Sequence, residues 1–175
     1  MGFLPVPSDD ELSADARAAA NRFGDEHPGP LNALDRALLN NVTVFDAYVR
    51  WFDVKDELEA LVGERAVTLF SLALSRAVPA PYPTAFFEGV LRDGGDDPVN
   101  PQVTEAESLL LEWGRAVGAD PSRVPAELIA RVEGTFKEST RAVLAGYAGL
   151  MFAVCIFSLI AQLPAEGSVS GTSAP

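Results

Sequence analysis

The chain has 175 residues, 48% of them hydrophobic, and a formal net charge of -12. This length and composition fit one globular domain with a real core, and they argue against a disordered chain. The acidic surface repels nucleic-acid phosphates and anionic lipid, and the Lys and Arg residues form no run that would offset this charge. We therefore expect no nucleic-acid partner.

The reactive sulfur and imidazole groups are few. Cys155 is the single cysteine, which rules out an intrachain disulfide and fits a reducing compartment. The first residues contain neither the basic region nor the apolar core of a secretory signal, so we expect the protein in the cytoplasm. His27, the only histidine, is expected to be a solvated loop residue. One Cys and one His predict no metal cluster and no cofactor.

Ala, Leu and Glu dominate the periodic segments and strand signals are nearly absent, so the predicted fold class is all-α. A Ser8 to Glu11 capping box predicts a first helix to about Phe23. Thr104 with Glu107 and Thr135 with Glu138 predict two further boxes, and Asp53 is expected to cap a short helix. The other expected helices cover residues 31–39, 44–52, 55–62, 65–77, 83–91 and 126–133.

The last helix carries the most apolar stretch, because residues 142–163 contain no charged side chain. That length would suffice to cross a bilayer, but a helix that is apolar all round also suits the centre of a bundle. Lys137 and Arg141 flank it at its N-terminal end only, and we favour the buried helix over a membrane span. Its mildly polar face, with Tyr147, Met151 and Cys155, suits a cavity or a subunit interface.

The stretch from Arg65 to Phe87 has the layout of a thiol redox site. It resembles the carboxymuconolactone decarboxylase and alkylhydroperoxidase D (AhpD)-like superfamily, whose redox members place Cys-x-x-Cys at a helix start, a His one turn inside and a Glu on the preceding helix. Here Ala80 and Pro83 stand at the cysteine positions, Phe87 at the His position and Thr68 at the Glu position.

Residues 30–48, 104–107 and 145–151 extend this resemblance over most of the chain. It implies an AhpD-like helical bundle with a long apolar C-terminal helix over residues 27–163, and a homo-oligomer, either a trimer or a hexamer. Residues 1–26 would form an N-terminal helical extension, and the Ser- and Gly-rich residues 164–175 a disordered tail.

The residues at the former redox site cannot carry thiol chemistry, which needs a thiolate of lowered pKa and a second thiol. Cys155 sits between Val154 and Ile156 in the least polar helix, where a thiol behaves as a small hydrophobe. Alkylhydroperoxidase-like activity is therefore the least favoured of the functions that we consider.

An apolar hollow with a few hydroxyls remains, which is the usual form of a small-molecule site. We predict Tyr82 and Thr68 as catalytic residues, Tyr82 because a phenol can donate a hydrogen bond to a carbonyl or enolate. The alternative is that Tyr82 and Phe87 only fill core space. The predicted ligand contacts are Phe86, Phe87, Tyr147, Met151, Cys155 and Ser158.

Two functions are compatible with this hollow. The first is a non-redox, cofactor-independent enzyme that positions an apolar small molecule for cyclisation, isomerisation or decarboxylation, as in specialised metabolism. The second is a noncatalytic relative that binds a ligand or assembles with a catalytic partner.

Overall fold

The computed structural model describes residues 2–165, and within that range it contains helices, turns and loops but no strand. The all-α prediction is confirmed. All but two residues of the predicted tail at 164–175 lie outside the described range. The elements are a 3-10 turn (Asp9–Glu11) and the helices α1 (Ala14–Glu26), α2 (Ala33–Leu38), α3 (Val42–Val49), α4 (Phe52–Val62), α5 (Glu64–Ala77), α6 (Pro81–Asp93), α7 (Glu105–Ala119), α8 (Ala126–Thr135) and α9 (Glu138–Ala161).

One capping box opens its helix as the sequence predicts. The Thr104 amide donates to the Glu107 carboxylate at 2.8 Å, and the Glu107 amide donates to the Thr104 hydroxyl at 3.3 Å, which satisfies two amides at the start of α7. The Ser8 amide likewise donates to the Glu11 carboxylate at 2.8 Å, but this box opens only the 3-10 turn. α1 starts later, after Ser13.

Two other predicted caps are wrong. Thr135 is the last residue of α8, and its hydroxyl donates to the Arg131 carbonyl at 2.8 Å instead of capping the next helix. Asp53 lies inside the first turn of α4, which begins one residue earlier. At position 135 the preceding helix continues into the residue, and at position 53 the helix itself starts earlier, so in both places the backbone is already helical where a cap was expected.

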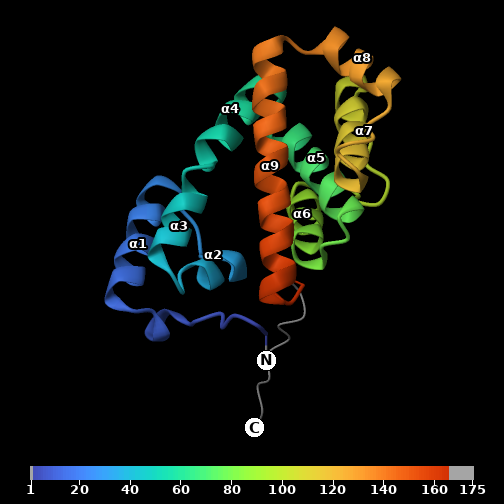
Figure 1. Cartoon of the computed structure of the whole chain (residues 1–175). Helices are drawn as coiled ribbons and strands as arrows, with labels where there is room; N and C mark the ends of the chain where they lie inside the picture. Colours follow the sequence, from blue (N-terminus) through green and yellow to red (C-terminus); the bar gives the residue numbers. More distant parts are fainter. Residues whose placement is uncertain (1, 166–175) are drawn as a thin grey trace.

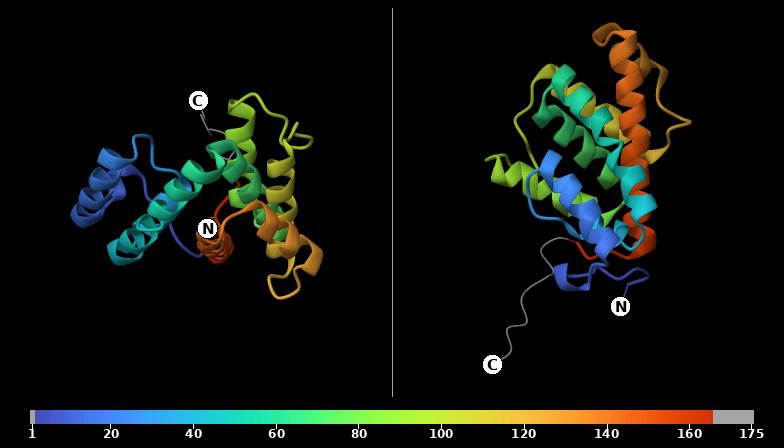
Figure 2. Two further views of the ribbon diagram at one scale, coloured as in Figure 1. Left: turned by 90° about the horizontal axis from the view of Figure 1, so that it is seen from above. Right: turned by 90° about the vertical axis from the view of Figure 1, so that its left-hand side faces the viewer.

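α9 runs through the middle of the molecule (Figure 1), and α4, α5, α6, α7 and α8 all contact it. Figure 2 shows α1, α2 and α3 on one side of α9 and α5, α6, α7 and α8 on the other. The N-terminal segment passes the C-terminal end of α9, where the Leu4 amide donates to the Ala161 carbonyl at 3.5 Å. The Asn40 side-chain amide donates to the Pro5 carbonyl at 2.8 Å, which ties this segment to the residues after α2.

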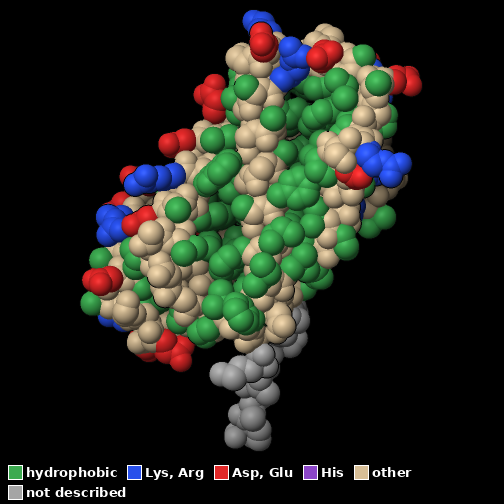
Figure 3. All heavy atoms as spheres, viewed as in Figure 1, with side chains coloured by type: hydrophobic (Ala, Val, Ile, Leu, Met, Phe, Trp, Pro, Cys, Tyr) green, Lys and Arg blue, Asp and Glu red, His purple; other side chains and the backbone are tan. Residues whose placement is uncertain are grey.

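By length and composition α9 would also span a membrane, and the core helix of a soluble bundle passes the same test. About 44% of its most apolar stretch is buried inside the protein. The outer side exposes Ile156, Leu159 and Ile160, and hydrophobic side chains flank α9 on the face that Figure 3 displays. The choice between a buried helix and a membrane span therefore stays a prediction.

α5 and α7 pack closely because α7 presents glycines to the backbone of α5. A Cβ atom at Gly114 would lie 2.7 Å from the Phe70 carbonyl oxygen, and one at Gly118 would lie 2.7 Å from the Leu74 carbonyl oxygen. This contact makes α5 the buried helix that the sequence predicts over residues 65–77. α5 contacts α7 as well as α9, so it connects these two helices within the bundle.

Candidate functional site

A cavity of about 630 Å³ lies between α9 and α6 on one side and the N-terminal helices on the other. Its volume falls within the range of small-molecule sites. Most of the wall is aromatic or aliphatic, and the lining residues are Phe23, His27, Pro28, Gly29, Pro30, Leu31, Asn32, Leu34, Asp35, Tyr48, Phe52, Lys55, Tyr82, Pro83, Phe86, Phe87, Tyr147, Leu150, Met151 and Val154. Residue 23 belongs to the predicted N-terminal extension, so that extension contributes to the cavity.

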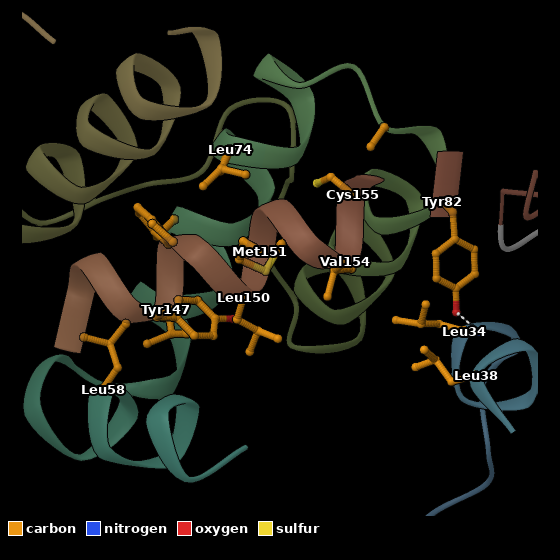
Figure 4. Packing of buried hydrophobic residues seen from close by; sticks show 14 of the residues in the cluster. Leu34, Leu38, Leu58, Leu74, Tyr82, Tyr147, Leu150, Met151, Val154 and Cys155 are labelled. Carbon is orange, nitrogen blue, oxygen red and sulfur yellow. Dashed lines mark hydrogen bonds between the residues drawn. The ribbon is translucent and has the colours of Figure 1, made fainter. Parts of the chain in front are cut away.

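Five of the predicted site residues line this cavity together. Tyr82, Phe86 and Phe87 come from the first two turns of α6, while Tyr147 and Met151 lie one turn apart on α9. Figure 4 shows Tyr147 and Met151 along α9, with Tyr82 near the C-terminal part of that helix. The helical spacing that predicted the α9 pair follows from about 3.6 residues per turn.

The Tyr82 hydroxyl is held by the protein. It accepts the Leu34 amide proton at 3.1 Å, drawn as the dashed line in Figure 4, and donates to the Asn32 side-chain oxygen at 3.1 Å. Tyr82 is only 3% exposed. These two bonds connect the start of α2 to α6, so the phenol has a structural role, in addition to its ring forming part of the cavity wall.

The Tyr147 hydroxyl points away from the cavity toward α5. It lies 2.8 Å from the Ser71 hydroxyl, which itself donates to the Val67 carbonyl at 2.8 Å, so Tyr147 is the donor of the pair. Burial is the main cause that raises the pKa of the Tyr147 phenol. Thr68 also belongs to α5, and its hydroxyl donates to the Glu64 carbonyl at 3.1 Å. Thr68 does not line the cavity.

Cys155 and Ser158 also lie outside the cavity lining. Each residue turns a helix by about 100°, so Cys155 is rotated away from the cavity-lining Val154 into the core, where it is fully buried. Burial raises the pKa of the Cys155 thiol to about 12. Ser158 lies one turn further along α9, in a separate hollow beside Pro81 and Leu163, and donates to the Cys155 carbonyl at 2.9 Å.

His27 lies in the bend after α1, as the sequence predicts, but its side chain is packed against aromatic rings and is not fully solvated. Its ring is half-buried between Phe23 and Phe52, with 4.8 Å between its centroid and that of each phenylalanine, and it lines the cavity. The His27 amide closes the end of α1 by donating to the Phe23 carbonyl at 2.8 Å. This cap folds the residue back against the helix, and sequence spacing alone does not show that.

Asp35 and Tyr48 are two of the polar cavity residues that were not predicted as site residues. Asp35 is 3% exposed, and its carboxylate accepts the Asn32 amide proton at 3.0 Å. Tyr48 also lines the cavity, and no group within residues 2–165 forms a hydrogen bond with its hydroxyl. Burial raises the pKa of the Tyr48 phenol, and the nearby charge of Asp35 raises it further.

The positive charge at the cavity is already paired. The Lys55 ammonium lies 2.8 Å from the Glu59 carboxylate and 3.6 Å from that of Asp56. Within the described part of the chain, no three His, Cys, Asp or Glu side chains gather in a way that would hold a metal ion. The lining thus combines aromatic residues with the hydroxyl-bearing Tyr48 and the carboxylate-bearing Asp35.

Comparison with known proteins found no family model, no curated protein and no solved structure that matches this chain. The resemblance to the carboxymuconolactone decarboxylase and AhpD-like superfamily therefore stays a prediction, as do the homo-oligomer and the cytoplasmic location. We therefore infer function from the cavity itself.

Proposed function

We propose that the protein binds an apolar small molecule in this cavity and acts on it as an enzyme that needs neither redox chemistry nor a cofactor. The observation that carries the proposal is a cavity of about 630 Å³ with an apolar wall, in which burial and the charge of the Asp35 carboxylate raise the pKa of the Tyr48 phenol, whose hydroxyl has no hydrogen-bond partner among residues 2–165. A few polar groups in an apolar hollow orient a ligand and supply fixed dipoles during its reaction.

The charged residues of the cavity wall distinguish decarboxylation from isomerisation and cyclisation, the reaction types that the sequence left open. Decarboxylation starts from an anionic substrate, yet the cationic group on the wall, Lys55, is paired with Glu59, and Asp35 repels a second carboxylate. Aromatic faces and a carboxylate instead stabilise positive charge. The cavity therefore favours isomerisation or cyclisation through an electron-poor state over decarboxylation.

Ligand binding without turnover is the alternative function. It is favoured by one observation: the hydroxyls of both predicted catalytic residues are used inside the protein, Thr68 by the Glu64 carbonyl and Tyr82 by Asn32 and Leu34. A protein that keeps its cavity but does no chemistry needs no side chain with a reactive proton.

Peroxide chemistry has little support. The Cys155 thiol is fully buried, lies outside the cavity and has a pKa raised to about 12, whereas a peroxide-reactive cysteine needs an accessible thiolate. An alkylhydroperoxidase assay on the unmodified protein is expected to show no consumption of peroxide above the buffer rate.

Titration with N-phenyl-1-naphthylamine, a neutral dye that fluoresces in apolar sites, tests binding. We expect one saturable site on the wild-type protein. Val154→Phe adds a ring at the cavity wall and should weaken binding about tenfold or more, because filling a preformed pocket removes the contact area of the ligand. Ile160→Phe makes the same kind of change on the exposed side of α9 and should leave the affinity unchanged. Equal effects of the two substitutions would place the dye on the surface of α9 and refute the proposal.

Turnover separates the two functions. Compounds extracted from the protein, purified without detergent, are identified by mass spectrometry and incubated with fresh protein. An enzyme converts the compound to an isomer of the same mass, and Tyr48→Phe slows this conversion about tenfold or more. Stable binding with no product would support the noncatalytic alternative.

A further inference from the structure

We propose that the ligand of this cavity carries one positive charge on an apolar body, and that Asp35 is the residue that selects this charge. A hydrophobic amine or quaternary ammonium compound has this chemistry. The inference rests on the proposed function, because it specifies the ligand class of the same cavity.

Asp35 is a buried, carboxylate-bearing residue of the cavity lining. Asp35 lies in the first turn of α2, is 3% exposed, and still forms part of the cavity lining. Its carboxylate is held by the Asn32 amide at 3.0 Å, and its own amide donates to the Asn32 side chain at 3.0 Å. Asp35 is thus a cavity-lining residue whose buried carboxylate is held in a defined place by its helix cap. In such surroundings an opposite charge on the ligand is stabilised more than in water.

Several aromatic rings line the cavity together with Asp35. Phe23 and Phe52 meet edge to face with 5.4 Å between centroids, and Phe86 meets Phe87 in the same way at 5.2 Å. Tyr48 packs edge to face on Phe52 at 5.6 Å. The face of an aromatic ring is electron-rich and attracts a cation placed within about 6 Å of its centroid. Several rings around one hollow therefore favour a cationic group over an anionic one.

The charges near the cavity and on the protein as a whole also favour a cationic ligand. Lys55 is the cavity-lining ammonium, and its charge is offset by Glu59 at 2.8 Å and Asp56 at 3.6 Å. The chain as a whole carries a net charge of -12, which draws cations toward the protein and repels anions. The cavity and the protein surface thus select for the same sign of ligand charge.

The test compares two probes that have the same shape and differ in charge. One is 4-phenylbutyltrimethylammonium, and the other is its neutral counterpart in which a carbon replaces the nitrogen. Calorimetric titration of the wild-type protein at neutral pH is expected to show the cation binding at least about tenfold more tightly than the neutral probe. Asp35→Asn should remove this preference while leaving the affinity for the neutral probe within about twofold, because Asn keeps the cap and the side-chain volume.

The matched control is Asp46→Asn. It removes the same charge from α3, but Asp46 is an exposed partner of Arg22 and does not line the cavity, so the preference for the cation should be unchanged. Equal binding of the two probes to the wild-type protein would overturn the inference while leaving the proposed function intact. Binding of neither probe would overturn both. A preference that survives in Asp35→Asn would refute the assignment to Asp35, and if that variant fails to fold, the wild-type comparison alone decides for or against a cationic ligand.

Discussion

The clearest test of the site assignment is a pair of substitutions, Tyr82→Phe and Tyr48→Phe, each of which removes one phenolic hydroxyl. At position 82 the hydroxyl serves the Leu34 amide and the Asn32 side chain, both at 3.1 Å. Leu34 is the second residue of α2, so its amide has no partner within the helix. The residue is also 4% exposed, which keeps water from replacing the lost hydroxyl.

An amide left without a partner in the interior costs about 1–3 kcal/mol. Asn32 loses less, because its side-chain oxygen still accepts the Asp35 amide proton at 3.0 Å. We therefore expect Tyr82→Phe to lower the free energy of unfolding by about 2 kcal/mol, which for a chain of this size lowers the melting temperature by about 4–8 °C. Tyr48→Phe removes a hydroxyl that no described residue binds, so its unfolding free energy should stay within about 0.5 kcal/mol of wild type.

Urea denaturation of the three proteins measures both values. Ligand affinity, measured on the same samples with N-phenyl-1-naphthylamine, should be similar in wild type and Tyr82→Phe. A Tyr82→Phe variant as stable as wild type would refute the structural role of this hydroxyl. Equal losses of stability in both variants would show that the Tyr48 hydroxyl is bound inside the protein and is not available to a ligand.

Three further predictions concern the scaffold around the site. Gly114→Ala places a methyl group 2.7 Å from the Phe70 carbonyl oxygen and should cost about 1–3 kcal/mol in urea denaturation, whereas Gly89→Ala on α6, with nothing within 4 Å, should gain about 0.5–1 kcal/mol. Cys155 should react with a thiol reagent only at the rate of global unfolding, because burial raises the pKa of its thiol to about 12, and rapid labelling of the native protein would contradict this. The hydrogen bond from Arg65 lowers the pKa of Asp96. The pair therefore stabilises the fold above the ordinary carboxyl pKa, and this stabilisation is lost as the pH falls through the lowered pKa. The difference in unfolding free energy between wild type and Arg65→Met should shrink in acid, and a difference independent of pH would refute the pairing.

The helices could be predicted from the sequence because their signals are local. The box formed by Thr104 and Glu107 needs only residues three apart, and the apolar run of α9 is visible without any partner. The wrong predictions of helix caps also come from reading local signals alone. Thr135 has the right neighbour for a capping box at Glu138, but α8 continues through it, and which of two adjacent helices takes a residue depends on how both pack.

Part of the site could be predicted because helical spacing is also a local signal. Tyr82 and Met151 lie on α6 and α9, where helical spacing indicates a common face, and the structure brings both to the cavity. Asp35 and Tyr48 lie on the short helices α2 and α3, whose placement at the cavity depends on residues distant in the sequence, such as Tyr82, whose hydroxyl accepts the Leu34 amide proton. The Asn32 to Asp35 spacing is a signal for a helix cap, and it could have located Asp35 but not its burial. The direction of the Tyr147 hydroxyl, toward Ser71 and away from the cavity, has no signal in the sequence.

The central claim is that the cavity between α9 and the N-terminal helices holds an apolar small molecule. The most direct measurement is a crystal structure of the protein soaked with a bromine-substituted alkylbenzene, because anomalous scattering locates the bromine without reference to side chains. We predict a single strong bromine peak among Tyr48, Met151 and Phe87. Bromine peaks confined to the exposed side of α9 at Ile156 and Ile160, or the absence of any ordered peak, would contradict the claim.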